Sequence, residues 1–476
     1  GPTTHPTITQ TGLFAQDEWK LRSNLTLNVG LRYDVQNSAK PPVENPVATA
    51  AGILTNRLNT DTNNFGPRVG VAWDPLKTGK VVVRGGYGLF YGVTPSIMVG
   101  TAHSNNGVNV QTITFRDDTA AGRQMPSYPN NVCGAPSAQP NCAPPTGGSV
   151  GKPKIYVFQN DYQQPRVQQA SFGADFQVAP QTVVSVGYLF AKGDNLQRTR
   201  DINLGSPTSA TILDQSGITH AYLKYPAVRP ISAFDQIFQF ESSAHSNYNG
   251  LTLQVNRRFA HHFGAQGAYT WSHAIDDAPD ATAVVPGADD AKLLYSPSFP
   301  NLDRSSSVND IRHRFVGNWV WDMDYHHFDQ KVLEHVLGGW QLSGILTIQS
   351  GTPYTGLITG GNPDLNQDGN RSTERAGDIG RNTFRTPSYI SLDPRVTKRF
   401  KVTEGTNLQL FAEAFNILNR YNKVSINSNE FIVAGTPATL NFNNSPASTS
   451  RFGLPRSSFL PMNGARTVQL GAKFNF

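Results

Sequence analysis

Residues 25–35 read LTLNVGLRYDV, and this stretch alternates strictly between apolar and polar side chains. One set is Leu25, Leu27, Val29, Leu31, Tyr33 and Val35, and the other is Thr26, Asn28, Gly30, Arg32 and Asp34. Successive side chains of a strand point to opposite faces, so each set lies on its own face. The stretch therefore predicts a strand with one apolar face and one wet face.

Alternating runs of this kind recur along the whole chain. They cover 11–22, 25–35, 66–74, 80–91, 165–178, 181–191, 246–259, 262–274, 310–322, 339–350, 388–400, 406–418 and 465–476. Helical periodicity is almost absent between them. The sequence therefore predicts an all-β fold with about thirteen strands.

The connections between these runs alternate between short and long. Short connections cover 23–24, 75–79, 179–180, 260–261 and 402–405, and long ones cover 36–65, 92–164, 192–245, 275–309, 351–387 and 419–464. The connection at 323–338 is intermediate in length. An antiparallel up-and-down sheet with all its long loops at one end is typical of a transmembrane barrel with short periplasmic turns and long extracellular loops. The loops of a soluble sandwich need not alternate in this way.

The composition excludes several classes of protein. No run of 18 apolar residues is present, so no transmembrane helix is predicted, whereas a barrel strand needs only every second residue to be apolar. The net charge is +6, but Lys and Arg are scattered among the acids, which argues against nucleic-acid binding. Without a nucleophile elbow, a phosphate-binding loop or a zinc pattern, the chain is predicted not to be an enzyme.

Barrel closure predicts that more strands exist than this chain contains. An open sheet edge leaves unpaired N–H and C=O groups in hydrocarbon. Bacterial single-chain barrels have even strand numbers, and thirteen is odd. We therefore interpret residues 1–476 as the C-terminal part of a larger barrel in the outer membrane, with the plug and the first strands absent from this chain.

Residues 362–378, NPDLNQDGNRSTERAGD, predict a cation site in a long loop. Asp364, Asn366, Asp368 and Asn370 supply oxygens at alternate positions, and Gly369 allows a sharp turn, as in the opening of an EF-hand calcium loop. The closing Glu belongs at position 12, which is Arg375, while Glu374 comes one residue early. Ca²⁺ is therefore the predicted cofactor, and the alternative is a polar loop whose Asp, Asn and Gly serve only backbone geometry.

Cys133 and Cys142 lie close together in a loop rich in Pro, Gly and Asn. Their proximity predicts a local disulfide in an oxidising compartment, and the alternative is two free surface thiols.

Several runs resemble TonB-dependent outer-membrane receptors, especially the large Oar-like group. They are FAQDEWKLRSNLTLNVGLRYD (14–34), NYNGLTLQVNRRF (247–259), DIRHRFVGNWVWD (310–322), GGWQLSGILTIQSGTPYT (338–355), and DPRVTKRFKV with LQLFAEAFNILNR (393–420). The resemblance implies a 22-stranded barrel around an N-terminal plug that contacts TonB. It makes the strands of this chain roughly the tenth to the twenty-second, so the plug and the first strands would come from elsewhere.

The C-terminal stretch VQLGAKFNF (468–476) is similar to the assembly signal of that family. The matching positions are Gln469, Gly471, Phe474 and Phe476. The resemblance implies recognition by the barrel-assembly machinery through edge-to-edge strand pairing. The alternative is an ordinary terminal strand whose aromatic residues lie at the membrane interface.

The predicted function is TonB-dependent transport of an unidentified ligand across a Gram-negative outer membrane, by uptake or export. Alternation places Arg32, Arg84, Arg257 and Lys473 on the face that would line the lumen. One alternative is a surface scaffold or adhesin with calcium-stabilised loops. A weaker alternative is a soluble, secreted β-sandwich lectin.

Overall fold

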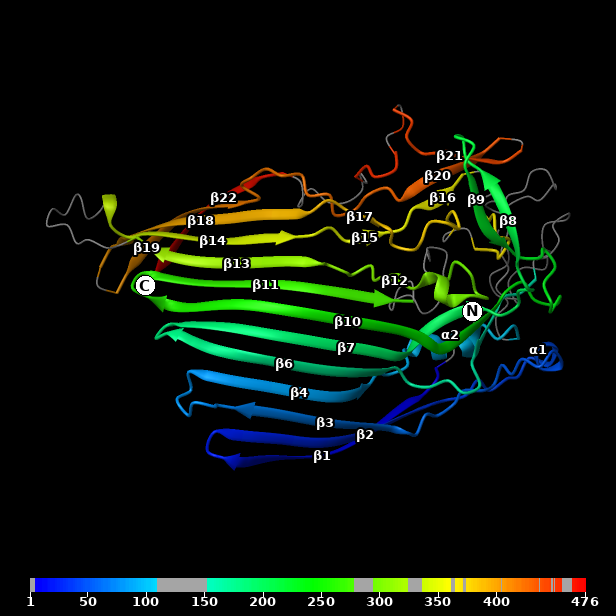
Figure 1. Cartoon of the computed structure of the whole chain (residues 1–476), viewed down its shortest axis with the longest axis horizontal. Coiled ribbons are helices and arrows are strands. Elements are labelled where there is room, and N and C mark those ends of the chain that lie inside the picture. The colour runs from blue at the N-terminus through cyan, green and yellow to red at the C-terminus, as the bar shows by residue number, and fades with distance from the viewer. Residues whose placement is uncertain are drawn as a thin grey trace, which may run out of the picture.

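The computed structural model describes residues 5–108, 152–277, 294–323, 336–360, 364–370, 374–403, 405–435, 437–446, 448, 450–455 and 465–476. One long antiparallel sheet organises these residues (Figure 1). The main path through the sheet consists of β1 (Ile8–Arg22), β2 (Leu25–Ser38), β3 (Asn64–Trp73), β4 (Val81–Tyr91), β6 (Arg166–Ala179), β7 (Thr182–Asp201), β10 (Ile237–Ala260), β11 (Phe263–Asp276), β13 (His313–Asp322), β14 (Trp340–Gln349), β18 (Tyr389–Lys401), β19 (Asn407–Phe415) and β22 (Thr467–Asn475).

These strands confirm the alternation found in the sequence. Each of the thirteen predicted runs overlaps one strand of the path, and each strand pairs antiparallel with its neighbours along the path. Short turns join the strands at the left end of Figure 1, and the long loops gather at the right end. One short turn is formed by His261 and His262, whose φ angles of 47° and 64° correspond to the left-handed conformation that tight hairpins use.

The loop end carries small elements that strand alternation did not predict. They are α1 (Pro46–Ala50), α2 (Ser96–Ser104), β5 (Ile155–Phe158), β8 (Thr208–Leu213), β9 (Thr219–Lys224), η2 (Pro300–Asp303), β12 (Ser305–Ser306), β15 (Pro353–Tyr354), β16 (Leu357–Thr359), β17 (Phe384–Arg385), β20 (Asn429–Ala434) and β21 (Thr439–Phe442). None of the described helices has the length and apolar character to cross a membrane.

The register keeps two chemically different faces on the sheet. Across β2, β3 and β4, Val29 lies opposite Val69, which lies opposite Tyr87. Across β22, β19 and β18, Leu470 lies opposite Ala412, which lies opposite Val396. Val29, Val69 and Leu470 are 38%, 45% and 78% exposed, so no described residue covers this apolar face. Such an uncovered face matches the lipid-facing surface of an outer-membrane barrel.

Arg257 lies on this apolar face, and its predicted place on the lumen face is wrong. It follows Leu253 and Val255 at two-residue spacing and lies opposite Thr182 and Ala265. Its guanidinium lies 5.7 Å from the centre of the Phe263 ring. The residue is close to the short turn, where a long side chain can cover apolar surface and still place its charge at the membrane interface.

The buried core lies at the loop end of the sheet. One cluster joins Met98 and Val99 of α2 to Tyr156 and Phe158 of β5 and to Phe240 of β10. β5 pairs in parallel with the first residues of β10, which extend the sheet beyond the predicted strand 246–259. A second cluster joins residues of β8, β16, β20 and β21. The loops are therefore packed against one another and against the strand ends.

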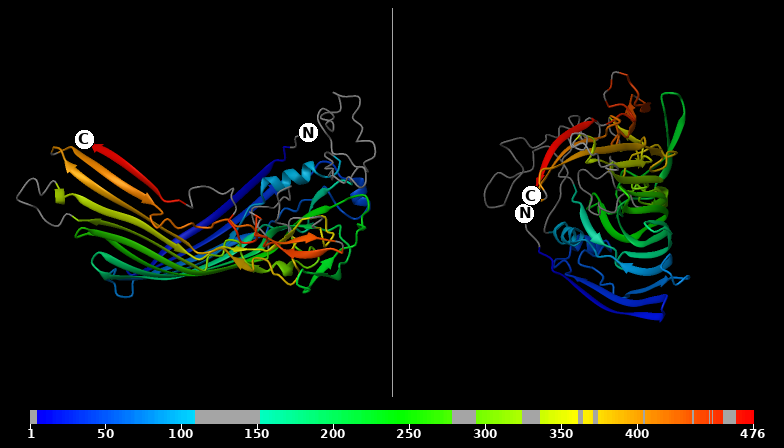
Figure 2. Two further views of the ribbon diagram at one scale, coloured as in Figure 1. Left: turned by 90° about the horizontal axis from the view of Figure 1, so that it is seen from above. Right: turned by 90° about the vertical axis from the view of Figure 1, so that its left-hand side faces the viewer.

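The sheet is curved and open (Figure 2). β1 and β22 are the two ends of the strand path, and within the described residues they are not paired with each other. Each therefore presents one edge of backbone N–H and C=O groups outside the sheet.

Candidate functional site

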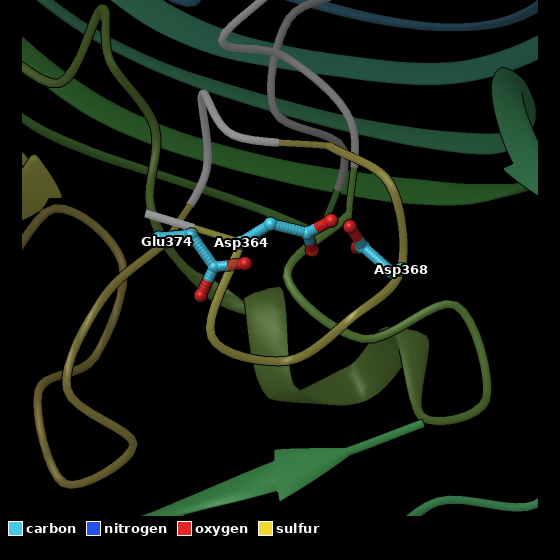
Figure 3. Close-up of side chains that lie close together, drawn as sticks. All are labelled: Asp364, Asp368 and Glu374. Atoms are coloured by element: carbon cyan, nitrogen blue, oxygen red, sulfur yellow. The ribbon is translucent and has the colours of Figure 1, made fainter. Parts of the chain in front are cut away.

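Three carboxylates converge in the loop between β16 and β17. Asp364, Asp368 and Glu374 each place an oxygen so that all three atoms lie within 4.8 Å of one another (Figure 3). Glu374 is 2% exposed and Asp368 is 3% exposed, while Asp364 is partly buried. An arrangement of carboxylate oxygens alone suits a hard cation such as Ca²⁺.

The backbone of the loop holds two of these carboxylates in place. The N–H of Gly369 donates to Oδ1 of Asp364 at 3.2 Å, and the N–H of Asn370 donates to Oδ1 of Asp368 at 2.6 Å. Gly369 has a φ of +88°, which disfavours any residue with a Cβ. A Cβ there would also lie 2.9 Å from a guanidinium nitrogen of Arg229. Gly369 is therefore required both for the turn and for the close approach of Arg229.

A neighbouring loop anchors the same turn. Arg229 donates from one nitrogen to Oδ2 of Asp201 at 2.8 Å and from another to the main-chain oxygen of Asp368 at 2.7 Å. The N–H of Tyr225 donates to the main-chain oxygen of Asn366 at 2.7 Å. Arg229 thus binds the backbone of Asp368 and leaves the carboxylate of that residue to the acidic cluster.

Arg375, at the position where an EF-hand places its closing Glu, has a different partner. Its guanidinium donates to Oδ1 of Asp303 at 2.8 Å and lies 4.3 Å from the centre of the Tyr295 ring. Arg375 and Asp303 are both almost fully buried. This pair connects the 294–303 segment to the cation loop, but it does not neutralise Glu374.

Burial and mutual repulsion change the acidity of the cluster. Burial raises the pKa of Glu374 to about 10, and the charges of Asp368 and Asp364 act in the same direction. Burial raises the pKa of Asp368 to about 7; the hydrogen bond from the Asn370 N–H opposes this increase, and the charge of Asp364 adds to it. Buried carboxylates are costly without compensation, and a bound cation would provide it.

The structure brings together only part of the predicted ligand set. Asn366 uses Oδ1 to accept a hydrogen bond from the N–H of Asp368 at 2.9 Å, and its Nδ2 donates to the main-chain oxygen of Tyr295 at 3.3 Å. Asn370 contributes its N–H to Asp368, as described above. Glu374 joins the cluster although the prediction omitted it. In the sequence, Glu374 stands at position 11 of the predicted calcium loop instead of position 12, which was the signal for its role.

The terminal strand presents its four predicted assembly residues on two faces. Phe474 and Phe476 lie on the apolar face, are 56% and 99% exposed, and have ring centres 6.3 Å apart. Gln469 and Gly471 lie on the other face, opposite Glu413 and Phe411. A Cβ on Gly471 would overlap the Phe411 ring, so the glycine provides room for that ring.

The polar face contains three of the four predicted lumen residues. Arg32 pairs with Asp34 and Arg84 pairs with Asp175, both with N–O distances of 2.9 Å, and Lys473 lies opposite Gln409. A hollow of about 450 Å³ indents this side of the sheet, and its polar lining includes Gln16, Glu18, Asn28, Arg68, Gln169 and Ser171. This face can therefore line a water-filled space.

Cys133 and Cys142 lie outside the described residues, so the predicted disulfide stays a prediction.

Comparison with known proteins identifies related sequences and structures. A family model described as an outer membrane beta barrel domain matches residues 2–377 and 366–469. The chain is 26% identical over 304 residues to the TonB-dependent transporter Oar of Myxococcus xanthus. That match covers 60% of this chain and 25% of Oar, so the chain matches about a quarter of the length of this relative.

Two transporters are among the solved structures that are similar to this chain. The outer membrane transporter YddB from Escherichia coli has a TM-score of 0.52 at 11% sequence identity, over 98% of this chain and 45% of YddB. The FrpB iron transporter from Neisseria meningitidis has a TM-score of 0.48 at 12% identity, over 99% of this chain and 46% of FrpB. The likeness to YddB concerns the fold alone.

Proposed function

This chain belongs to the outer membrane beta barrel family, and from that premise we propose that it forms the C-terminal part of the barrel of a TonB-dependent transporter. The observation that carries the proposal is the open sheet, with thirteen alternating strands on its path and with outer edges of β1 and β22 that no described strand pairs. In lipid those edges require partner strands. Further barrel strands of the same protein would supply them and would enclose the plug.

The polar face would form part of the lumen wall. Besides the Arg84–Asp175 pair, it carries Arg395 3.7 Å from Glu413. These pairs keep fixed charges next to water, where a polar ligand can exchange hydration for side-chain contacts. In this mechanism the outer loops and plug capture the ligand, and TonB acting on the plug opens the path. The chain itself needs no catalytic group for these steps, so we propose that it is not an enzyme.

We also propose that β22 is the strand that the assembly machinery recognises. It combines an unpaired edge with the aromatic residues Phe474 and Phe476 next to the short-turn end. Deletion of Phe476 from the whole protein should reduce the folded, heat-modifiable fraction in outer membranes. Lys473→Gln, on the polar face of the same strand, serves as the control for general effects of changing the terminal strand.

The transport proposal is tested by genetics with a panel of labelled ligands. Iron chelates, oligosaccharides and peptides are offered to cells that lack the gene, cells that lack TonB, and cells that lack both. A transporter predicts that at least one compound loses TonB-dependent accumulation when the gene is removed, with no additional loss in the double deletion. Binding of a compound that persists without TonB, together with unchanged accumulation of the whole panel, would contradict transport and favour a surface adhesin.

A further inference from the structure

We infer that Asp364, Asp368 and Glu374 form a calcium site that fastens the outer loops of this protein to one another. The inference rests on contacts within the outer loops and does not depend on the proposed function. It also differs from an EF-hand, because the loop closes with Glu374 at its eleventh position and leaves Arg375 for another contact.

The carboxylate of Glu374 is almost fully buried, with 2% of the residue exposed. Its Oε1 atom is buried and has no hydrogen-bond partner among the described residues. The neighbouring Arg375 cannot compensate it, since its guanidinium is held by Asp303 and by the main-chain oxygen of Leu302. A buried carboxylate oxygen without a donor is costly. A cation bound between the three carboxylates removes this cost.

The converging atoms are of the kind that Ca²⁺ binds. The cluster offers oxygen from three carboxylates and contains neither His nor Cys. Ca²⁺ binds six to eight oxygens in flexible geometry and uses carboxylates, amide oxygens and water together. A Zn²⁺ site would instead be expected to include imidazole or thiolate ligands.

A bound cation would hold several outer loops together. The main-chain oxygens of Asn366 and Asp368 bind Tyr225 and Arg229 of the β7–β10 connection. The side chain of Asn366 binds the main chain at Tyr295, in the β11–β13 connection. The main-chain oxygen of Glu374 accepts from the N–H of Ile358 in β16 at 2.8 Å. Closing the cation loop therefore fixes contacts with two other loops and with a strand of its own loop.

The location of the site indicates the affinity to expect. It lies among the long loops at the end opposite the short turns, which in an outer-membrane barrel is the extracellular side. Extracellular calcium modules commonly have dissociation constants of about 10⁻⁴–10⁻³ M. A weak structural site of this kind would be filled wherever calcium is abundant and lost on chelation.

The test measures binding of Ca²⁺ alone to the whole protein in detergent after removal of metals with EGTA. Calcium binding is followed by equilibrium dialysis, and thermal unfolding is followed with and without about 10 mM Ca²⁺, roughly tenfold above the weak end of the expected range. The variants are Glu374→Gln and Asp368→Asn. The matched control is Asp378→Asn, which removes a half-exposed carboxylate of the same loop that faces His220 and lies outside the cluster.

The inference predicts that the wild type and Asp378→Asn bind one more Ca²⁺ per chain than Glu374→Gln or Asp368→Asn. Calcium should raise the unfolding temperature of the wild type and of Asp378→Asn. It should not raise that of Glu374→Gln or Asp368→Asn. In EGTA, Glu374→Gln and Asp368→Asn should unfold at a temperature no lower than the wild type, because each substitution removes a buried carboxylate. Such an unfolding temperature shows that the two variants are folded. Equal calcium binding by all four proteins would overturn the inference, as would the absence of a calcium effect on the wild type.

Discussion

The strand sheet and the outer loops both hold polar groups away from water, but they satisfy these groups in different ways. On the sheet, apolar residues such as Leu470 are exposed, and backbone pairing satisfies the polar groups. In the loops, charged residues such as Arg375 and Asp303 are buried and satisfy one another. The sheet therefore depends on an external apolar solvent, whereas the loops depend on internal charge compensation. A substitution should therefore destabilise the loops when it removes the partner of a buried charge, and the sheet when it places a charge on the apolar face.

The largest effect is expected from breaking the buried Arg375–Asp303 pair. Arg375→Met leaves Asp303 as a buried carboxylate without that partner, which typically costs about 3–5 kcal/mol. Hydrogen exchange of the whole protein should accelerate in the 294–303 segment and remain unchanged in β1 and β2. The control is Arg84→Met, which breaks an exposed pair on the sheet and should cost less than about 1 kcal/mol. Equal effects of the two substitutions would remove the distinction between the regions.

The next effect is expected on the apolar face of the sheet. Leu470→Lys places a charge among the residues that would meet lipid, which costs about 2–4 kcal/mol near the middle of the bilayer. Gln469→Lys, one residue earlier on the polar face, should be almost neutral. Urea unfolding in lipid vesicles measures both. If Gln469→Lys destabilises as much as Leu470→Lys, the assignment of the faces is wrong.

A smaller effect is expected at Gly471. Its hydrogen faces the ring of Phe411, so Gly471→Val should overpack this contact and cost about 1–3 kcal/mol in the same unfolding experiment. Adding Phe411→Leu should restore part of the loss, because it removes the ring that the new side chain meets. Ala472→Val changes the opposite face and should have little effect. No rescue in the double variant would mean that the ring does not constrain Gly471.

The smallest expected effect is a dependence of local stability on pH, confined to the loop end of the molecule. Burial raises the pKa of Asp310, but the N–H of Ala274 and the cationic groups of Arg385 and Arg312 outweigh it, and the resulting pKa is about 2. A carboxyl with a lowered pKa stabilises the folded state fully above its unfolded value of about 4, and this contribution is lost as the pH falls through about 2. Acid should therefore loosen this segment between pH 4 and 2. Hydrogen exchange of this segment in Asp310→Asn should not show this pH dependence. If the variant shows the same pH dependence as the wild type, another group is responsible for it.

The sheet was predictable from the sequence because each strand repeats one local rule. Alternation located all thirteen strands of the path, and the loop lengths indicated their direction. Arg257 was predicted on the lumen face, although it follows Leu253 and Val255 at two-residue spacing and therefore shares their apolar face. Its position near a turn allows the guanidinium to lie over Phe263.

The loops were less predictable because their contacts join distant segments. The spacing of Asp364 and Asp368 pointed to the acidic cluster, but Glu374 did not fit the expected position. Arg375 lies at that position, and its pairing with Asp303 spans 72 residues of sequence. No local pattern specifies such a contact.

The two-faced sheet is tested most directly by measuring whether successive residues along β22 face lipid or water. Spin labels are placed singly at 468, 469, 470, 472 and 473 of the whole protein in lipid bilayers, with Cys133 and Cys142 replaced by Ser. Accessibility to oxygen, which concentrates in lipid, and to a water-soluble nickel complex is measured at each position. Residues 468, 470 and 472 should be accessible to oxygen, and residues 469 and 473 to nickel. Uniform nickel accessibility at all five positions would contradict a membrane-spanning barrel strand.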